Sequence, residues 1–397
     1  MNVLVVNAGS ESLKLRVLDG NDRVIRSSEI SKPEIAESTT SSPGSLPHAN
    51  HNRDWDISKP LAEFLSTAAG SGCDVTVVGH RVVHGGADFT SAVLLDDRSR
   101  VRLASLDDLA PLHNPPARSA IDAATRLLPS VPQVACFDTA FHAGMPETAS
   151  TYALPSEWVK RWGIRRYGFH GLSCAYAIKR AAAILGRPVE ELRVVVCHLG
   201  GGASVTSVSR GRSMDTTMGF TPLEGLVMAT RAGDVDPGAL VWVLQHGVRV
   251  EEAADALEYG SGLLALSGDR TEDMKELLSL RSSGDERAAL AVGVYVHRLR
   301  AKIAAMMAAT DGTDALVFTG GVGEHSAPIR SSACSGMAWL GVEIDDVANA
   351  SADHDCDISG PGSSVRTLVI RAREDLEIAS ECRQLLGGIS DGVQSAR

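Results

Sequence analysis

The feature that most constrains the fold is a strand–turn–strand unit that occurs at two distant places in the chain. The first copy has apolar strands at residues 3–6 and 13–18 around the turn NAGSES. The second has valine-rich strands at residues 194–198 and 205–208 around the turn LGGGAS. Short apolar runs around a polar turn that contains glycine are typical of β-hairpins. Two copies predict two related lobes, each opening with a hairpin that faces phosphate.

The remaining pattern is mixed α/β, and the chain length of 397 residues favours two domains with a cleft between them. Apolar periodicity predicts both further strands and helices. The further strands are expected at residues 75–83, 134–137, 315–319 and 365–372, and the helices at 116–128, 172–185, 238–245, 250–259, 271–280, 286–310 and about 375–386. A stretch rich in serine, threonine, proline and asparagine at 31–54 predicts a surface loop.

Charge and hydropathy argue against several classes of protein. The formal net charge of -11 would repel a nucleic-acid backbone, and no basic run offsets it. No apolar run reaches the roughly 20 residues that span a bilayer, so we expect no membrane partner. The amino terminus has no basic segment before its apolar residues, which favours a cytoplasmic protein. The seven cysteines form no CxxC pair, so neither a disulfide framework nor a zinc knuckle is expected.

Three glycine-rich loops follow strands directly, at residues 7–12, 198–204 and 319–324. Glycine lets backbone N–H groups approach oxygen anions closely, and ligands of α/β folds bind at such strand ends. A single loop of this kind is most often only a turn, whereas three in one chain predict phosphate binding. The chain has no GxxxxGK[ST] motif, so a P-loop enzyme is excluded.

Cations and an acid stand at other strand ends. Arg81 interrupts an apolar strand in GHRVVHGG, Asp138 ends another in FDTAFH, and RRYGFHG precedes a helix. His80 and His84 do not predict zinc, because four strand residues span about 13 Å. Each feature also has a structural interpretation: Asp138 could equally cap the next segment, and the acids of TRAGDVDPG could cap a helix. In an acidic protein, local cations nevertheless predict an anionic ligand.

Taken together, the motifs resemble those of the acetate kinase family, within the superfamily of acetate and sugar kinases, Hsp70 and actin. The resemblance runs nearly end to end, through VNAGSESLK, GHRVVHGG, LAPLHNPP, FDTAFH, RRYGFHG, TPLEG, TRAGDVDPG, FTGGVGE and EDLEIA. It implies two duplicated ribonuclease-H-like (actin-like ATPase) domains with a cleft between them. Residues 1–148 plus about 375–397 would form the N-terminal lobe, and residues 149–374 a C-terminal nucleotide-binding and dimerisation lobe. A homodimer is implied.

The resemblance also implies reversible phosphoryl transfer between ATP and acetate, giving ADP and acetyl phosphate, and it assigns roles to residues. The catalytic set would be Arg81, Asp138, His170 and Arg231. The substrate pocket would be lined by Arg81, Val83, Leu112, Phe169 and Pro222. Phosphate and nucleotide would contact Ser10, Ser12, Lys14, His198, Leu199, Gly200, Gly201, Gly202, Asp273, Met274, Lys275, Gly321, Val322, Gly323, Glu324 and His325. Asn7 and Glu374 would hold Mg²⁺, or Mn²⁺ in its place, through water.

The chemistry supports these residue types, because phosphoryl transfer requires positioning and neutralised equatorial oxygens. Asp138 is the family's catalytic acid, but acetate is already ionised at pH 7, so we hypothesise that Asp138 orients Mg²⁺ and its waters. The chain departs from the family at Gly201, Lys275 and His325, all on the nucleotide side, which leaves the preferred nucleotide open. Two alternatives remain: a propionate or butyrate kinase on the same scaffold, since one methylene discriminates by only about 1–3 kcal/mol, or a non-catalytic nucleotide sensor.

Overall fold

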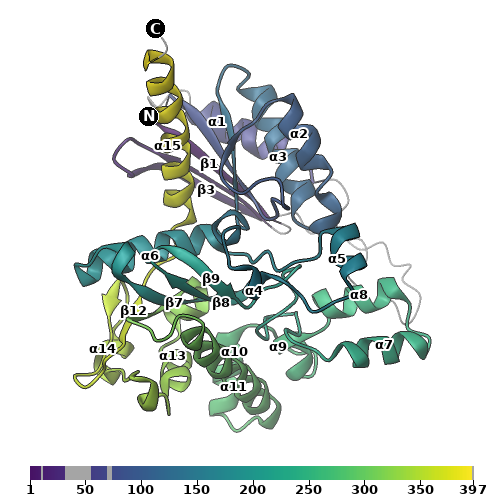
Figure 1. The fold of residues 1–397 in the computed structure, drawn as a ribbon, viewed down its shortest axis with the longest axis vertical. Coiled ribbons are helices and arrows are strands. Elements are labelled where there is room, and N and C mark those ends of the chain that lie inside the picture. The colour runs from purple at the N-terminus through teal and green to yellow at the C-terminus, as the bar shows by residue number, and fades with distance from the viewer. Residues whose placement is uncertain (10–11, 32–54, 69–73, 396–397) are drawn as a thin grey trace.

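The computed structural model describes residues 1–9, 12–31, 55–68 and 74–395, and side chains as far as residue 388. It has two lobes, one above the other in Figure 1, and each is built around a six-stranded mixed sheet. The loop predicted at 31–54 lies outside the described residues apart from Ser31, which ends a strand. Ser10 and Cys73 also lie outside them.

The sheet of the first lobe has the strand order β3-β2-β1-β4-β6-β5. Its strands are β1 (Val3–Ala8), β2 (Ser12–Leu18), β3 (Val24–Ser31), β4 (Val77–Val82), β5 (Val93–Leu94) and β6 (Gln133–Phe137). β1, β4 and β6 run parallel, whereas β2, β3 and β5 are antiparallel to their neighbours. The parallel strands β4 and β6 therefore end at the same edge, where Arg81 and Asp138 stand.

The sheet of the second lobe has the order β11-β12-β10-β7-β8-β9. Its strands are β7 (Arg193–Leu199), β8 (Ala203–Ser209), β9 (Arg212–Thr216), β10 (Ala315–Thr319), β11 (Cys356–Asp357) and β12 (Arg366–Val369). β7, β10 and β12 run parallel, and β8, β9 and β11 are antiparallel to their neighbours. When the order of the second sheet is read from β9, its strands correspond to those of the first sheet, read from β3, in both position and direction.

The two sheets also share a local irregularity. The pairing of β2 with β3 shifts between Val17 and Leu18, and that of β8 with β9 shifts between Ser207 and Val208. When the two hairpins are superposed by their registers, Val17 and Ser207 occupy equivalent positions. A β-bulge inserts a residue at a defined place and increases the twist of its strand. Identical topology with an equivalent bulge confirms the predicted duplication.

Helices cover the sheets and connect the lobes. Those of the first half are α1 (Ser58–Ala68), α2 (Asp97–Ala104), α3 (Asn114–Leu127), α4 (Glu147–Ser150), α5 (Ser156–Trp162) and α6 (Gly171–Leu185). The second half adds α7 (Pro237–Gln245), α8 (Val250–Tyr259), α9 (Gly262–Leu266), α10 (Met274–Ser282), α11 (Glu286–Ala308), α12 (Gly320–His325), α13 (Ala327–Cys334), α14 (Asp346–Ala350) and α15 (Glu374–Ser395). Among the described residues, no helix is long and apolar enough to cross a membrane.

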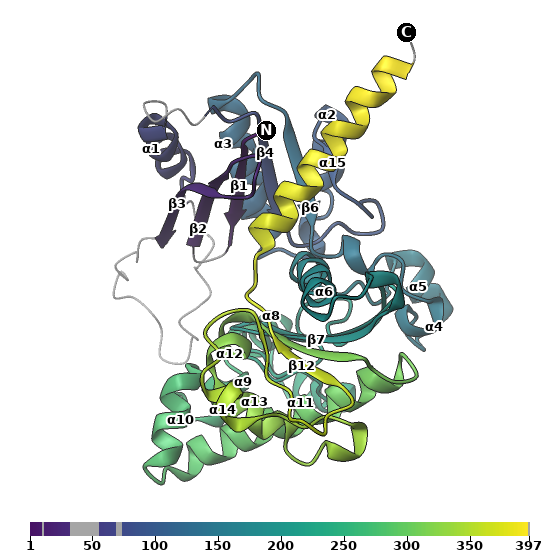
Figure 2. The same cartoon turned by 90° about the vertical axis from the view of Figure 1, so that its left-hand side faces the viewer.

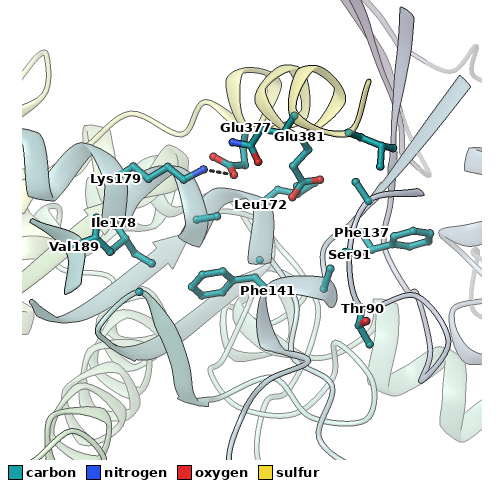
Figure 3. Close-up of a pocket in the computed structure, with 17 residues that line it drawn as sticks. Thr90, Ser91, Phe137, Phe141, Leu172, Ile178, Lys179, Val189, Glu377 and Glu381 are labelled. Atoms are coloured by element: carbon teal, nitrogen blue, oxygen red, sulfur yellow. Dashed lines mark hydrogen bonds and ion pairs between the residues drawn. The ribbon is translucent and has the colours of Figure 1, made fainter. Parts of the chain in front are cut away.

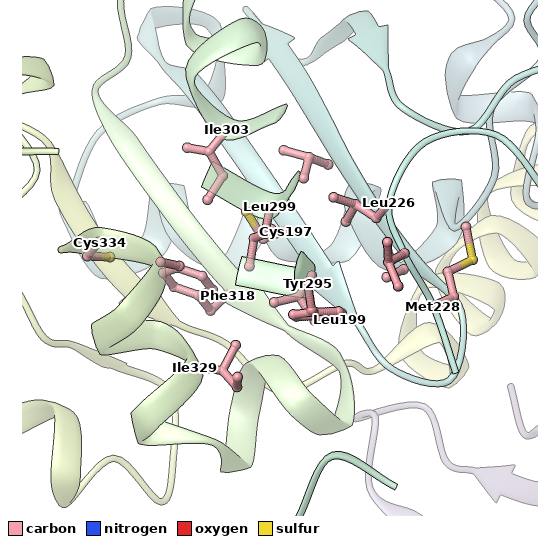
Figure 4. Packing of buried hydrophobic residues seen from close by; sticks show 14 of the residues in the cluster. Cys197, Leu199, Leu226, Met228, Tyr295, Leu299, Ile303, Phe318, Ile329 and Cys334 are labelled. Carbon is pink, nitrogen blue, oxygen red and sulfur yellow. The ribbon is translucent and has the colours of Figure 1, made fainter. Parts of the chain in front are cut away.

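Each sheet buries apolar side chains on both faces, as parallel strands require. In the first lobe, α3 packs on one face through Ala120 and Ala124, and α15 packs on the other through Ile378 and Cys382. In the second lobe, α11 covers one face of the sheet with Tyr295 (Figure 4), and α6 covers the other. The final helix, α15, thus returns the chain to the first lobe (Figure 2). The domain boundaries at 148 and 374 remain predictions.

Candidate active site

Arg81 is the centre of a polar cluster at the carboxyl ends of β1, β4 and β6. Its Nε and Nη2 atoms donate to the two oxygens of Asp138 at 3.1 and 2.6 Å. Its Nη1 donates to Oδ1 of Asn7 at 3.3 Å, and its Nε lies 3.6 Å from a carboxylate oxygen of Glu374. Four of the predicted residues are therefore in contact. The parallel topology brings Asn7, Arg81 and Asp138 together, because β1, β4 and β6 end side by side, and Glu374 joins them at the start of α15.

Burial controls the electrostatics of this cluster. Asp138 is 1% exposed, and a buried charge needs a partner with good geometry, which the fork of Arg81 supplies. Burial acts to lower the pKa of Arg81, but the negative charges of Asp138 and Glu374 outweigh it and raise that pKa. Burial also raises the pKa of Glu374, while Arg81 acts in the opposite direction. The guanidinium is therefore always charged, and its neighbours hold it in place.

His170 lies at a strained corner that leads into α6. Its φ of 58° is in the left-handed region, which is uncommon for a residue with a side chain. The next residue, Gly171, donates its N–H to the carbonyl of Asp138 at 3.0 Å, and a Cβ there would lie 2.0 Å from that oxygen. Only glycine permits this approach. The corner therefore fixes His170 next to the end of β6.

The imidazole of His170 stacks on that of His198, with ring centroids 4.2 Å apart. Nδ1 of His170 lies 3.0 Å from the hydroxyl of Ser204, and Nδ1 of His198 lies 2.8 Å from that of Ser173. Burial lowers the pKa of His198 to about 4, and the charge of Arg81 adds to this effect. Burial, then His198 and Arg81, lowers the pKa of His170 well below its usual value. Both rings are therefore neutral at pH 7.

Arg231 approaches His170 from the second lobe. A Cβ placed on Gly202 would lie 3.3 Å from Nε2 of His170 and 3.9 Å from Nη1 of Arg231, so both groups line the same turn. Nε of Arg231 donates to Glu258 at 2.7 Å, and its Nη2 lies 3.5 Å from Nε2 of His113. Burial, with the charges of Arg231 and Arg81, lowers the pKa of His113 to about 3.

The prediction from sequence missed His113 and Glu258. His113 lies inside the LAPLHNPP motif, directly after Leu112, so its motif was a usable signal. Glu258 lies in α8, where its helix contains two other glutamates, Glu251 and Glu252. Nothing in the sequence distinguishes it from them, because its partner Arg231 is 27 residues away.

The four residues predicted for an apolar pocket differ in burial. Phe169 is 2% exposed and belongs to the core of the second lobe, and Val83 packs against that core. Leu112 and Pro222 are half-buried. The ring of His84 meets that of Phe169 edge to face, with centroids 5.4 Å apart. The structure thus places Val83 and Phe169 on one apolar surface, at the start of the segments that carry His84 and His170.

The glycine loops of the second lobe meet each other. Gly320 has a φ of 78°, and a Cβ there would lie 2.7 Å from the carbonyl of Leu199. Nothing lies within 4 Å of a Cβ placed on Gly201 or Gly321, so both face open space. The carboxylate of Glu324, a predicted nucleotide contact, accepts from the N–H groups of Gly320 at 2.9 Å and Ala372 at 2.8 Å. The carboxylate of Glu324 therefore ties the start of α12 to the segment before α15.

The remaining predicted nucleotide contacts come from several elements. Asp273 caps α10 by accepting from the N–H of Glu276 at 2.8 Å, whereas Met274 is buried in the core. Leu199 and Gly323 are buried, Gly200 and Val322 are half-buried, and Lys275 and His325 are exposed. Ser12 and Lys14 lie on β2, and Lys14 pairs with Glu29 at 2.9 Å. Ser10 lies outside the described residues.

A buried arginine, Arg330 in α13, supports the short helix α12. It is 1% exposed, and its Nη1 donates to the carbonyls of Gly323 and Glu324 at 3.0 and 2.8 Å. Its Nε and Nη2 donate to Asn349 at 2.8 and 2.7 Å. These bonds satisfy a charge that has been removed from water. No local pattern in the sequence indicates this role of Arg330.

Comparison with known proteins places the chain among kinases. The profile of the acetokinase family matches residues 2–380. The chain is 44% identical to an acetate kinase of Synechococcus sp., over 98% of this chain and 100% of the relative. It superposes on the crystal structure of Porphyromonas gingivalis acetate kinase with a TM-score of 0.85 at 33% identity, covering 97% and 99% of the two chains. A propionate kinase from Francisella tularensis gives 0.83 at 36% identity, with 96% and 98% covered.

Proposed function

Since the chain belongs to the acetokinase family, we propose that its polar cluster carries out phosphoryl transfer between ATP and acetate. The enzyme is a phosphotransferase whose acceptor is a carboxylate, and ATP and ADP are its co-substrates. The observation that carries the site assignment is that cations from both lobes, Arg81 from β4 and Arg231 from the segment before α7, both act on the neutral imidazole of His170.

In the proposed reaction an acetate oxygen forms a bond to the γ-phosphorus while the bond to the oxygen that bridges the β- and γ-phosphorus breaks. Negative charge spreads over the equatorial oxygens, so Arg81 and Arg231 would neutralise it. His170 accepts at Nδ1 if the hydroxyl of Ser204 donates, which leaves Nε2–H to donate to a phosphoryl oxygen. A neutral imidazole can act in this way across the physiological pH range. No proton has to leave acetate.

We further propose that Asn7 and Glu374 hold Mg²⁺ through its waters, with Asp138 orienting them. The fit rests on the donor set, since these three residues supply amide and carboxylate oxygens around Arg81. Mg²⁺ usually keeps several of its waters and takes only one or two carboxylates from the protein. Mg²⁺ bound there would neutralise the phosphate oxygens and the carboxylates. Mn²⁺ accepts similar oxygen ligands and could replace it.

We propose a homodimer through the second lobe. α7 has no buried residue although its sequence is PGALVWVLQ, and Val241 and Trp242 are 52% and 59% exposed. In the neighbouring α8, Val250 is 68% exposed. A contiguous apolar surface of this kind marks an interaction site in soluble proteins. A second copy of the same chain would cover it with the same helices, as a twofold axis requires. We also propose that the protein works in the cytoplasm.

Trapping acyl phosphate with hydroxylamine tests the enzyme assignment. We expect hydroxamate from acetate, ATP and Mg²⁺, and none when either substrate is omitted. The absence of hydroxamate in the complete mixture would favour the non-catalytic sensor.

A comparison of kcat/KM for acetate, propionate and butyrate tests the substrate. The likeness to a propionate kinase makes propionate the second candidate. An apolar pocket separates neighbours in this series by about 10–200-fold. We expect acetate to give the highest value, and a higher value for butyrate would contradict the assignment.

A further inference from the structure

A cavity of about 540 Å³ lies between α6, α15 and the end of β6 (Figure 3). Its walls come from both lobes: Phe137 and α15 belong to the first sheet and its covering helix, and α6 covers the second. None of the residues assigned above to substrate, nucleotide or metal lines it. Its volume is within the range of sites for small organic ligands.

The walls are mostly apolar, with a polar group of residues on the side of α15. Phe141, Leu172 and Ile178 give the cavity an apolar surface that would match an aromatic body, while the ring of Phe137 stacks on that of Phe89 in the core of the first lobe. The polar side carries Lys179 of α6 and two acids of α15 (Figure 3). A ligand that fits must therefore combine an apolar body with one polar end.

The charges on the polar side determine the sign of that end. Lys179 already pairs with Glu377 at 2.6 Å, so the two charges compensate each other. Glu381 is left over: its buried oxygen Oε2 has no hydrogen-bond partner among the described residues. Beside the carboxylate lies the thiol of Cys136, which is only a weak donor. Because Oε2 is buried, a cationic donor in the cavity would pair with the other oxygen of this carboxylate, whereas an anion would be repelled.

The titration of Glu381 agrees with this geometry. Burial raises its pKa to about 7, and the charge of Glu377 raises it further, while Lys179 opposes the change. A bound cation would restore the ionised form, as an opposite charge does at short range.

We propose that this cavity binds a small organic cation with an aromatic body, its protonated nitrogen paired with Glu381, and that the bound ligand slows phosphoryl transfer.

The cavity and the active site share three segments of backbone. Phe137 lines the cavity and the next residue is Asp138, while Gly171 lines it and the residue before is His170. These two segments are bonded to each other, since the N–H of Gly171 donates to the carbonyl of Asp138 at 3.0 Å. On α15, Glu377 lines the cavity one turn after Glu374.

A ligand in the cavity would therefore contact both lobes, next to the segments that carry the proposed catalytic residues. Kinases that exclude water do so by movement of lobes or lids around the substrates. A ligand wedged between α6 and α15 opposes such movement without occupying the substrate sites. It should lower kcat and leave the KM values for acetate and ATP unchanged.

The experiment uses 2-phenylethylamine as the probe, which is protonated at pH 7.5, and neutral 2-phenylethanol as its matched control. Binding to the full chain is measured by calorimetry or ligand-observed NMR, and initial rates are measured at saturating acetate and ATP. We expect the amine to bind at least tenfold more tightly than the alcohol and to reduce kcat severalfold with no change in either KM.

Two variants separate the parts of the proposal. Glu381→Gln should reduce amine binding to that of the alcohol, while Glu157→Gln, in an exposed residue of α5, should leave it unchanged. Ala175→Leu fills the cavity and should abolish binding of both compounds, which keeps the test decisive if Glu381→Gln does not fold. The proposal is overturned by unsaturable amine binding, by equal binding of amine and alcohol, by competition with acetate or ATP, or by an unchanged kcat at saturation.

Discussion

At the scale of single residues, the pair of Arg81 and Asp138 connects the proposed phosphate contact with the proposed metal site. Asp138 holds the guanidinium by two hydrogen bonds, and through Arg81 it is connected to Asn7 and Glu374. This geometry gives Asp138 a role that needs no proton transfer. In the proposed mechanism it positions the cation that would meet the phosphate, and it contributes an oxygen to the proposed metal site.

We therefore expect Asp138→Asn to lower kcat by about 10²-fold or more, because the amide forms a weaker pair with Arg81. The pH profile of kcat should keep its shape, since no proton is transferred by this group. Steady-state rates from pH 6 to 9 check both points. Arg98→Ala, at an exposed arginine of α2, is the control for a surface substitution. A variant that kept most of its turnover would rule out both a proton-transfer and a positioning role.

The residues of this cluster were predictable from sequence, whereas the contacts between them were not. Arg81 interrupts an apolar strand, and Asp138 ends one, so each was recognisable as a side chain that emerges at a strand end. His113 and Glu258 contact Arg231 across long sequence separations, and local pattern contains no information about such contacts. The stacking of His170 on His198 also depends on how α6 packs against β7 of the second sheet.

At the scale of elements, α12 begins directly after β10 with two adjacent glycines that have opposite requirements. Gly320 is in the left-handed region and lies against the carbonyl of Leu199, whereas Gly321 faces open space. The structure therefore separates a glycine needed for the fold from one that leaves room for a ligand.

Matched alanine substitutions test this difference. Gly320→Ala should lower the free energy of unfolding by about 1–3 kcal/mol, because the methyl group would strain the backbone and press on β7. Gly321→Ala should preserve stability and raise the KM for ATP severalfold while leaving that for acetate unchanged. Urea unfolding and initial rates measure the two effects. Equal stability of the two variants would contradict the assignment.

The strand predictions agree with the structure where the strands are buried, whereas strands at the sheet edges were missed. Residues 315–319 were predicted with the bounds that β10 has, and all five are buried. β3 and β9 were missed, although each is the third strand of its hairpin unit. β3 alternates between exposed and half-buried residues, and β9 reads RSMDT, so neither carries an apolar pattern. An edge strand has one neighbour and little burial, so tertiary pairing decides its structure.

At the scale of the whole molecule, the exposed apolar surface of α7 predicts self-association. Trp242→Glu would place a charge at the centre of this surface, so we expect a monomer at concentrations where the parent chain is a dimer. Sedimentation velocity measures the mass of both. Trp339→Glu is the matched control, because Trp339 is 77% exposed and distant in sequence from α7 and α8. A parent chain that is monomeric at all micromolar concentrations would refute the dimer.

The stability of the whole molecule should depend on pH through its buried histidines. Burial, the largest cause in each case, lowers the pKa of His80, His84, His142 and His198 to about 4 and that of His113 to about 3. In the unfolded chain these groups titrate near 6.5. Between about pH 4 and 6.5 the unfolded chain therefore binds more protons than the folded chain. Acidification in this window must favour unfolding.

We expect each of these histidines to remove about 2 kcal/mol from the free energy of unfolding between pH 7 and pH 5. Glu381 opposes them, because burial raises its pKa to about 7 and the folded chain gains a proton there on acidification. Burial also lowers the pKa of His170, and it raises the pKa of Glu374 and Asp215. The histidines outnumber these carboxyl groups, so the urea midpoint should fall steeply from pH 7 to pH 5 at a constant m-value. The number of protons taken up on unfolding at pH 5.5, measured by calorimetry in two buffers, should exceed two. A flat midpoint, or a release of protons, would show that the buried imidazoles are ionised in the folded protein.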